Sequence, residues 1–199
     1  IKKLYAYLFH NLPNKKNIFE EYLLVLIKIK SSGLIQNIGV SVQSIDELKF
    51  VLNYEDVSYI QMPYNILDRR WNKLTNTIKC LKKKRKIIIA CRSVFLQGLL
   101  LTKNLRKWKQ CNVNDSDEIF YFLEKMKQQF ECLNFAELSI KYINSIDWID
   151  QIVLGSDNLD QLKSNLSYFS SHKFSKYDIN KIDELKPVLS DEVLNPSFW

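Results

Sequence analysis

Short apolar runs alternate along the chain with longer stretches in which apolar residues recur at helical spacing. The apolar runs lie at 4–9, 37–41, 57–62, 87–90 and 149–154. They are nearly continuous rather than alternating, which is typical of parallel strands that are buried on both faces. The pattern therefore predicts about five buried parallel strands.

The stretches between the apolar runs predict helices. They lie at 17–32, 44–53, 68–84, 116–131, 134–145, 158–169 and 177–185. Gly33 follows the first of them, as glycine commonly follows a helix end, and the segment from Ser44 to Glu47 has the form of a capping box. Strands joined by helices pair in parallel through right-handed crossovers, so the sequence predicts an α/β fold.

Two α/β architectures fit this order: an open doubly wound sheet and a (β/α)8 TIM barrel. The chain has no GxGxxG turn, which disfavours the dinucleotide-binding form of the open sheet. A barrel needs eight strands, so five strands would leave three strand–helix units upstream of Ile1. Because Ile1 is not methionine and lies almost directly on a strand, we expect residues 1–199 to form a single incomplete barrel domain.

Polar residues stand where each predicted strand ends. They are His10 and Asn11, Ser41, Gln61, Arg92 and Ser93, and Gly155 and Ser156. Any one of them could simply end its strand. In both architectures, however, ligands bind at the carboxyl ends of the parallel strands. Together these residues predict a polar rim with a ligand site at one end of the sheet.

Charge and hydropathy exclude two classes of partner. The net charge of +7 comes largely from lysine, with the densest cluster at 82–86 directly before a predicted strand. The cluster has no interleaved aromatic residues, so a solvated helix C-terminus is favoured over a nucleic-acid patch. No apolar run approaches the roughly 18–20 residues that span a bilayer, and no signal peptide pattern is present. We expect neither a nucleic-acid nor a membrane partner.

The cysteines indicate a reducing compartment. Cys80, Cys91, Cys111 and Cys132 are scattered and include no CxxC pair. In a chain of 199 residues with 46% hydrophobic positions, they indicate reduced thiols in a cytoplasmic protein rather than a disulfide framework or a zinc site. We therefore expect no metal site.

Several segments, taken in order, carry a resemblance to a known family. They are YAYLFHN, GLIQNIGVSVQSIDELKFVL, YIQMPYNILDRRW, ACRSVFLQGLL, IDQIVLGSDNLDQLKSNL and LNPSFW. The chain resembles the C-terminal part of the aldo-keto reductase family, from about the fourth barrel strand to the C-terminus. The resemblance implies a partial TIM barrel without its N-terminal three strand–helix units. It also implies an oxidoreductase that transfers hydride between NADP(H) and a small-molecule aldehyde, ketone or corresponding alcohol.

Family members use a catalytic tetrad of Asp, Tyr, Lys and His. His10 in YLFHNLP matches the histidine, which hydrogen-bonds the carbonyl oxygen of the substrate. The other three residues lie upstream of the fourth strand in the family, and nothing before His10 supplies them here. We therefore expect this chain to be a truncated fragment that does not reduce carbonyls by itself.

The resemblance also assigns cofactor contacts. Ser41 and Gln61 match residues that hydrogen-bond the nicotinamide carboxamide, although Val42 replaces an Asn that is common in the family. Arg92 stands where many members stack a tyrosine on the nicotinamide ring, and a guanidinium can also lie flat on a ring. The loop that runs along the pyrophosphate is matched by Ser93, Leu96, Gln97, Gly98 and Leu99.

The junction of the last predicted strand with the helix at 158–169 matches the adenosine phosphate site. Backbone N–H groups at such a junction form an anion site. The matching residues are Gly155, Ser156, Gln161 and Asn165. Gly155 stands where many members have Lys, and Gln161 where many have Arg, while Asp157 and Asp160 add negative charge nearby. NADP(H) is the cofactor that the family implies, with NAD(H) as the alternative.

A non-catalytic function is the alternative to an enzyme. The chain would then be a reductase-like protein that binds a nucleotide or a partner chain. An open five-stranded sheet exposes strand edges, so we also expect self-association through those edges. The sequence encoded upstream of Ile1 distinguishes the two classes, because the enzyme requires three further strand–helix units with a Tyr and a Lys.

Overall fold

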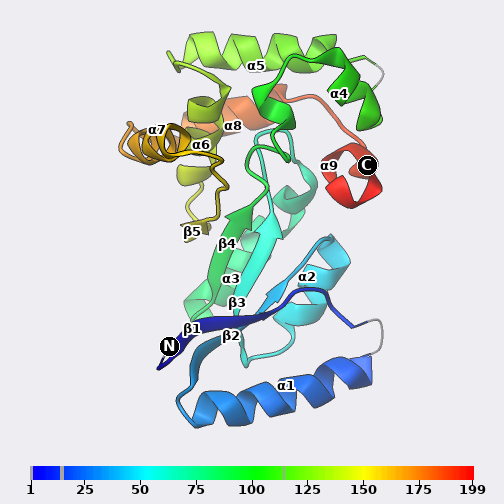
Figure 1. The fold of residues 1–199 in the computed structure, drawn as a ribbon, viewed down its shortest axis with the longest axis vertical. Helices are drawn as coiled ribbons and strands as arrows, with labels where there is room; N and C mark the ends of the chain where they lie inside the picture. The colour runs from blue at the N-terminus through cyan, green and yellow to red at the C-terminus, as the bar shows by residue number, and fades with distance from the viewer. Residues whose placement is uncertain (1, 14–15, 114) are drawn as a thin grey trace. The chain divides into compact units, whose positions relative to one another are not determined.

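Strands and helices alternate along the chain in the computed structural model, which describes residues 2–13, 16–113 and 115–199 (Figure 1). The strands are β1 (Leu4–Phe9), β2 (Ile35–Ser41), β3 (Val57–Pro63), β4 (Ile88–Arg92) and β5 (Gln151–Ile152). They follow one another in the sheet in chain order, β1-β2-β3-β4-β5. This confirms the predicted α/β fold with five strands, while the three upstream strand–helix units stay a prediction.

The helices fall close to the predicted stretches. The α-helices are α1 (Lys16–Ser31), α2 (Ile45–Leu52), α3 (Thr75–Lys84), α4 (Leu105–Gln110), α5 (Asp117–Gln129), α6 (Phe135–Asn144), α7 (Leu159–Phe169), α8 (Lys176–Leu185) and α9 (Asp191–Leu194). The 3₁₀ turns are η1 (Arg70–Leu74), η2 (Leu99–Leu101) and η3 (Pro196–Phe198). Hydrophobic spacing therefore predicts the longer helices well, and the differences lie at the element ends and in the short helices α4 and α9.

The predicted helix at 68–84 is shorter than its periodicity indicates, because α3 begins only at Thr75, after η1. Asp68 Oδ1 accepts a hydrogen bond from Arg70 N at 2.9 Å. Side chains that bind the neighbouring backbone in this way compete with helix formation, so the α-helix starts beyond the contact.

The last predicted strand, 149–154, is likewise reduced to the two residues of β5. The residues before it form a turn in which Ile149 N donates to Ile146 O at 3.2 Å. Residues 91–115, which none of the predicted strands or helices covers, contain α4, whose first turn is capped by Asn104 Oδ1 accepting from Arg106 N at 3.0 Å. A helix this short carries too few apolar positions for periodicity to predict it.

The chain divides into two compact units, which are described separately. Unit 1 comprises Ile1–Pro63 and Trp71–Ala90, and unit 2 comprises Tyr64–Arg70 and Cys91–Trp199. Unit 1 carries β1 to β3 with α1 to α3, and β4 continues from unit 1 into unit 2. That residues 1–199 form a single domain stays a prediction.

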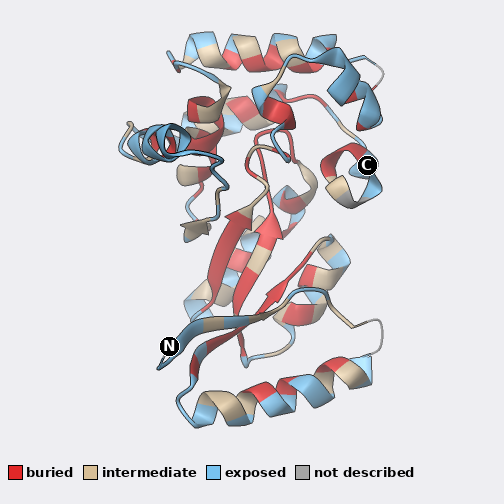
Figure 2. Ribbon diagram, in the orientation of Figure 1, coloured by how far each residue is buried: buried red, intermediate tan, exposed pale blue. Residues whose placement is uncertain are grey.

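In unit 1, β1 pairs in parallel with β2, and β2 pairs in parallel with β3. The register places Phe9 opposite Val40 and Ser41 opposite Gln61, so these strands end at the same edge. Figure 2 shows β2 and β3 largely buried, whereas β1 is exposed or half-buried. The prediction of two buried faces is therefore wrong for β1, because β1 is the terminal strand of the sheet order.

Phe19, fully buried on α1, lies at the centre of an aromatic cluster in unit 1. Its ring centroid is 5.1 Å from that of Phe9, 5.4 Å from Phe50 and 5.0 Å from Tyr54. Tyr54 Oη also donates to Glu20 Oε1 at 3.0 Å. Aromatic pairs of this kind stabilise a fold beyond the effect of the area that they bury. Here they attach α1 to β1 and to the end of α2.

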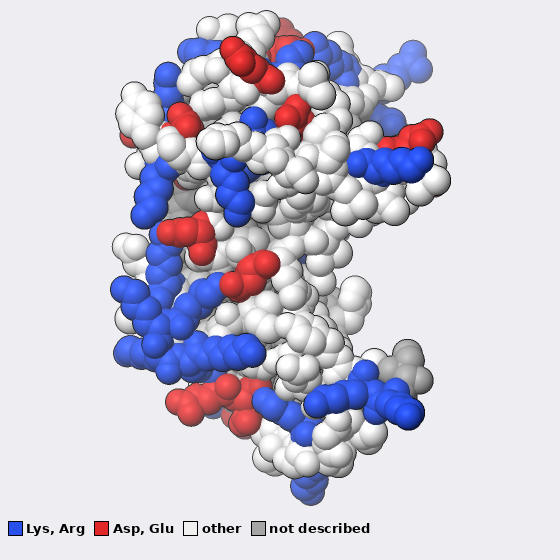
Figure 3. All heavy atoms as spheres, turned by 90° about the vertical axis from the view of Figure 1, so that its left-hand side faces the viewer, with Lys and Arg blue, Asp and Glu red and all other residues white. Residues whose placement is uncertain are grey.

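The basic cluster at 82–86 lies at the end of α3, as predicted. Lys82, Lys83 and Lys84 lie in the last helical turn, where cations complement the helix dipole. Arg85 follows them and donates to Leu52 O at 2.7 Å and to Tyr54 O at 2.6 Å. Figure 3 shows the Lys and Arg side chains that gather on one face of the molecule. The cluster thus caps a helix and ties it to the end of α2.

A buried polar network connects three segments of unit 2. Lys186, whose side chain is 0% exposed, donates from Nζ to Asp183 Oδ1 at 2.8 Å and to Tyr142 Oη at 3.0 Å. It also donates to the backbone oxygen of Asp68 at 3.1 Å. Tyr142 Oη donates to Asp183 Oδ1 at 2.6 Å and lies 3.1 Å from Tyr64 Oη. Burial lowers the pKa of Lys186, and Asp183 opposes that shift.

None of the helices within residues 2–13, 16–113 and 115–199 is long and apolar enough to cross a membrane. No group of three or more His, Cys, Asp or Glu side chains within that part of the chain could hold a metal ion. All four cysteines are free.

Gly39 of β2 lies where the sheet leaves no room for a side chain. A Cβ at this position would lie 2.7 Å from Tyr59 O and 2.8 Å from Leu8 Cγ. We expect Gly39→Ala to lower the free energy of unfolding by about 2 kcal/mol, as overpacking does. Urea denaturation followed by circular dichroism measures the change. Gly155→Ala is the matched control, because a Cβ there meets nothing within 4 Å, and an equal loss in both variants would contradict the explanation.

Candidate functional site

A cavity of about 870 Å³ lies in unit 2 beside the ends of β4 and β5. Its lining comes from the loop after β4, the start of α6, and the segment that leads from β5 into α7. The cavity therefore occupies the carboxyl ends of two strands, which is where ligands bind in α/β proteins.

Two backbone hydrogen bonds position the two sides of this cavity. Val153 N donates to Cys91 O at 2.7 Å and holds the end of β5 against the end of β4. Tyr64 N donates to Arg92 O at 3.0 Å and fixes the last residue of β4. The loop after Arg92 and the segment after Val153 consequently leave the strands side by side, and both line the cavity.

The loop after β4 has an unusual backbone conformation. Ser93, Leu96 and Gln97 have φ values of 58°, 48° and 53°, and Gly98 has a φ of 82°. A left-handed conformation costs about 1–2 kcal/mol for a residue other than glycine, and such residues cluster at ligand sites. Leu96 N donates to Ser93 O at 2.9 Å, and the Leu96 side chain is fully buried. The packing of Leu96 thus stabilises the strained turn.

Side chains at the start of α7 bind one another and the backbone. Asn158 Oδ1 accepts from Gln161 N at 2.9 Å, and Gln161 Oε1 accepts from Asp157 N at 2.8 Å. Farther along the helix, Asn165 Nδ2 donates to Ser156 Oγ at 3.1 Å. Asn158, Gln161 and Asn165 all line the cavity, so these contacts fix its α7 side.

The charged groups of the cavity divide between its two sides. Arg92 ends β4, and its Nη1 donates to Ser93 Oγ at 3.2 Å. Asp157 and Asp160 line the side formed by the start of α7. The cavity therefore offers a guanidinium on one side and carboxylate and amide groups on the other, which suits a ligand with an anionic part and a hydroxyl-rich part.

Most of the predicted cofactor residues meet at this cavity. Those that line it are Arg92, Ser93, Gln97, Gly98, Gly155, Gln161 and Asn165. Leu96 and Ser156 are not among the described lining residues. Leu96 is buried under the loop, and Ser156 binds Asn165. The sequence thus predicted which segments meet, although the part each residue plays toward a cofactor stays a prediction.

The remaining predicted site residues, His10, Ser41 and Gln61, belong to unit 1. Ser41 ends β2, is 4% exposed, and lies opposite Gln61 of β3 in the sheet register. His10 follows the end of β1 and is exposed. Parallel pairing therefore brings Ser41 and Gln61 together as predicted, and the catalytic role of His10 stays a prediction.

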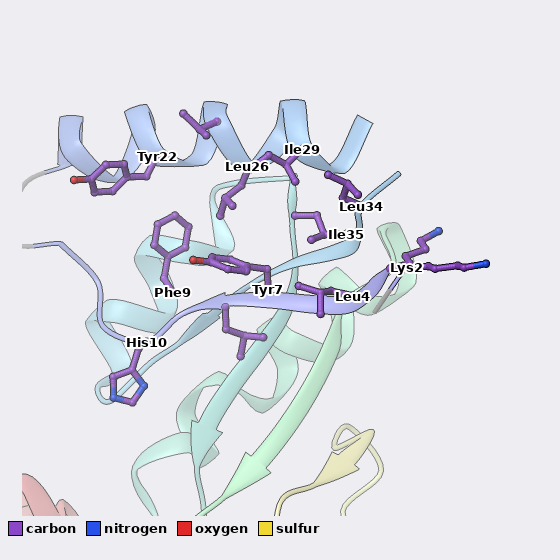
Figure 4. A pocket seen from close by; sticks show the side chains of 13 residues that line it. Lys2, Leu4, Tyr7, Phe9, His10, Tyr22, Leu26, Ile29, Leu34 and Ile35 are labelled. Carbon is purple, nitrogen blue, oxygen red and sulfur yellow. The ribbon is translucent and has the colours of Figure 1, made fainter. Parts of the chain in front are cut away.

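A second cavity of about 870 Å³ lies in unit 1 between β1 and α1 (Figure 4). We call it the β1–α1 groove; its apolar lining consists of Leu4, Tyr7, Leu8, Phe9, Tyr22, Val25, Leu26, Ile29, Leu34 and Ile35. Tyr7 and Phe9 point from β1 toward α1, where Tyr22 and Leu26 face them, and the imidazole of His10 is turned away from α1. An apolar groove of this kind suits a protein segment better than a nucleotide.

Sequence reasoning missed other lining residues, among them Asn134, Asn158 and Tyr168. Asn134 caps α6, with its Oδ1 accepting from Glu137 N at 2.9 Å, and its Nδ2 donates to Tyr168 Oη at 2.8 Å. An Asn directly before a predicted helix is a recognisable N-cap signal, so both asparagines were detectable as caps. Nothing in the sequence indicates that the two caps share a cavity.

The geometry defines an α/β protein with a ligand cavity at the carboxyl ends of β4 and β5. The model of the aldo/keto reductase family matches residues 2–187. The chain belongs to the aldo/keto reductase family, which confirms the resemblance. Which part of the family fold the chain represents stays a prediction. Comparison with curated proteins gives no match.

Solved structures share the fold. An aldo-keto reductase from Bacillus halodurans, in its holo form, gives a TM-score of 0.77 at 20% identity, over 94% of this chain and 62% of that one. A glycerol dehydrogenase from Gluconobacter oxydans gives a TM-score of 0.71 at 16% identity, over 98% of this chain and 61% of that one. A thermostable aldo-keto reductase in complex with the inhibitor epalrestat gives a TM-score of 0.66 at 20% identity, over 92% of this chain and 60% of that one. The chain thus spans about three-fifths of their length.

Cys91 directly precedes Arg92 at the cavity, yet its surroundings make it unreactive. Its Sγ donates to Tyr64 O at 3.2 Å. Burial raises the pKa of the Cys91 thiol far above its usual range and outweighs the lowering by Arg92. Burial also raises the pKa of Cys132 to about 11. Because the thiolate is the nucleophile, neither cysteine is a reactive group at neutral pH.

The exposed Cys80 should therefore be the thiol that reacts rapidly with an aromatic disulfide reagent in the folded protein at neutral pH. Absorbance of the released thiolate measures the reaction, and all four cysteines should react once urea unfolds the chain. Cys80→Ser should remove the fast phase and Cys91→Ser should leave it unchanged. A fast phase that depends on Cys91 would show that the end of β4 is open to solvent.

Proposed function

We propose that this chain supplies the cofactor-binding part of an oxidoreductase that transfers hydride between a nicotinamide dinucleotide and an aldehyde, a ketone or the corresponding alcohol. The observation that carries the proposal is the unit 2 cavity, which is lined by seven of the residues assigned to cofactor contacts. Membership of the aldo/keto reductase family supports the reaction class. NADP(H) is the cofactor that the resemblance implies, and NAD(H) is the alternative.

The cavity fits the adenosine diphosphate part of such a cofactor. Arg92 places a guanidinium at the end of β4, where it can bind a phosphate oxygen or lie flat on a ring. Gly155 leaves open space, because a Cβ there meets nothing within 4 Å. Ser93, Gln97 and Asn165 add hydroxyl and amide groups to the same lining. In this proposal the loop after β4 binds the pyrophosphate, and the β5–α7 segment binds the adenosine.

The catalytic chemistry divides between cofactor and protein. A bound nicotinamide supplies the hydride. His10 donates a hydrogen bond to the substrate's carbonyl oxygen, where negative charge develops, and one such donor is worth about 3 kcal/mol. Ser41 and Gln61, adjacent in the register of unit 1, match the residues that would hold the carboxamide. The proton for the oxygen comes in the family from a Tyr that a Lys and an Asp assist, and we infer that this chain contains none of the three.

The chain by itself should therefore bind a dinucleotide without reducing carbonyls. Steady-state oxidation of NADH and of NADPH with a panel of aldehydes and ketones, followed by absorbance, should stay at the rate measured without protein. A full-length aldo-keto reductase assayed in parallel is the positive control. Turnover above background that His10→Ala abolishes would show that the chain holds a complete catalytic set, and the proposal would be wrong on that point.

A second candidate function, binding of a partner chain, is favoured by the β1–α1 groove. Tyr7, Tyr22 and Val25 line it while 48%, 55% and 53% exposed. β1 is the terminal strand of the sheet order, and such an edge invites pairing with another chain. We infer that two copies of this chain associate through β1 and the groove.

Sedimentation velocity over a range of protein concentrations tests this association. The sedimentation coefficient should rise with concentration for the unaltered chain. Val25→Glu should shift the rise to at least about tenfold higher concentration, because it places a charge in an apolar contact. Leu133→Glu is the control, since Leu133 is 80% exposed and lies in unit 2. A coefficient that does not change with concentration, or an equal effect of both variants, would exclude the groove as the contact.

A further inference from the structure

The charges of the unit 2 cavity bear on which dinucleotide it accepts. Among the lining residues that the structure describes, Arg92 is the single basic one, and it ends β4. Asp157 and Asp160 are the acidic ones, and both are exposed at the start of α7. The α7 side of the lining therefore carries two carboxylates and no compensating cation.

The chain's own side chains already occupy part of the start of α7. Backbone N–H groups at such a terminus attract anions because they lack partners within the helix. Here Asn158 Oδ1 accepts from Gln161 N at 2.9 Å, and Gln161 Oε1 accepts from Asp157 N at 2.8 Å. A phosphate at this position would have to displace the chain's own amide groups.

We propose that this cavity selects NAD(H) over NADP(H), with Asp157 and Asp160 as the specificity-determining residues. The proposal rests on the proposed function, because it requires the cofactor to bind in this cavity. A phosphate monoester carries a charge of about −1.5 to −2 at neutral pH, so the 2′-phosphate of NADP(H) is repelled by both carboxylates. The ribose hydroxyls of NAD(H) instead donate hydrogen bonds, and a carboxylate is a strong acceptor for them.

Lack of space does not exclude the 2′-phosphate of NADP(H). A Cβ at Gly155 meets nothing within 4 Å, so the cavity has room next to the start of α7. The discrimination is therefore electrostatic and should weaken as salt screens the carboxylates. The Debye length falls from about 10 Å at 0.1 M to about 3 Å at 1 M ionic strength.

Equilibrium binding to the full chain measures the selectivity without relying on turnover. Two matched pairs of ligands are titrated by calorimetry: NADH against NADPH, and 5′-ADP against 2′,5′-ADP. At low ionic strength the member of each pair that lacks the 2′-phosphate should bind at least about tenfold more tightly. The ratio should shrink toward unity at 1 M salt.

Variants assign the effect to the two carboxylates. Asp157→Asn combined with Asp160→Asn should raise the affinity for NADPH by about tenfold and lower that for NADH, because the carboxylates that accept from its ribose hydroxyls are lost. Gly155→Lys should raise the NADPH affinity further, since the position has room for a side chain. Glu118→Gln removes one exposed negative charge at the start of α5, outside the cavity lining, and should leave the ratio unchanged.

The outcomes separate this inference from the proposed function. NADPH binding as tightly as NADH, or a ratio that the Asp157 and Asp160 variants do not change, overturns the selectivity while a dinucleotide site remains. Binding of neither dinucleotide nor of either ADP overturns both the selectivity and the proposed cofactor site. Tighter NADH binding that falls with salt and depends on the two aspartates supports both.

Discussion

The candidate site depends on one backbone hydrogen bond, from Val153 N to Cys91 O at 2.7 Å. It joins two segments that are far apart in the sequence, so the loop after β4 and the start of α7 line one cavity. Because the contact is made by main-chain atoms, it places Arg92 and Gly155 whatever their side chains are. The fold therefore fixes where a ligand can bind, while the side chains decide the charge that the ligand meets. In the proposed cofactor site, this separation allows acidic residues to stand where a 2′-phosphate would need a cation.

A second constraint is a buried polar network in unit 2. Lys186 is buried, and its ammonium donates to Asp183, Tyr142 and the backbone oxygen of Asp68. A buried charge is tolerated only when its hydrogen bonds are made, so the network ties α6 and the end of α8 to the segment after β3. The N-cap of α6, Asn134, lines the cavity. The network thus stabilises one wall of the site from a distance, without contributing a group to it.

Sequence patterns predicted the features that depend on a single element. Apolar runs located the strands, and parallel pairing then placed Ser41 beside Gln61. Features that depend on contacts between distant segments could not be predicted. Lys186 is of a residue type that is normally exposed, and its burial depends on partners in other segments. The exposure of β1 contradicts its apolar sequence for the same reason, because burial of a strand depends on what pairs and packs beside it.

The proposed function requires the dinucleotide to bind in the cavity at the ends of β4 and β5. Titration of the isotopically labelled chain with NADH, followed through backbone amide resonances, measures this binding residue by residue. Shifts should be concentrated at Ser93, Gly98 and Gly155, with Val25 and Leu34 of the β1–α1 groove unchanged. Shifts confined to the groove, or no shifts at saturating NADH, would show that the dinucleotide does not bind in this cavity.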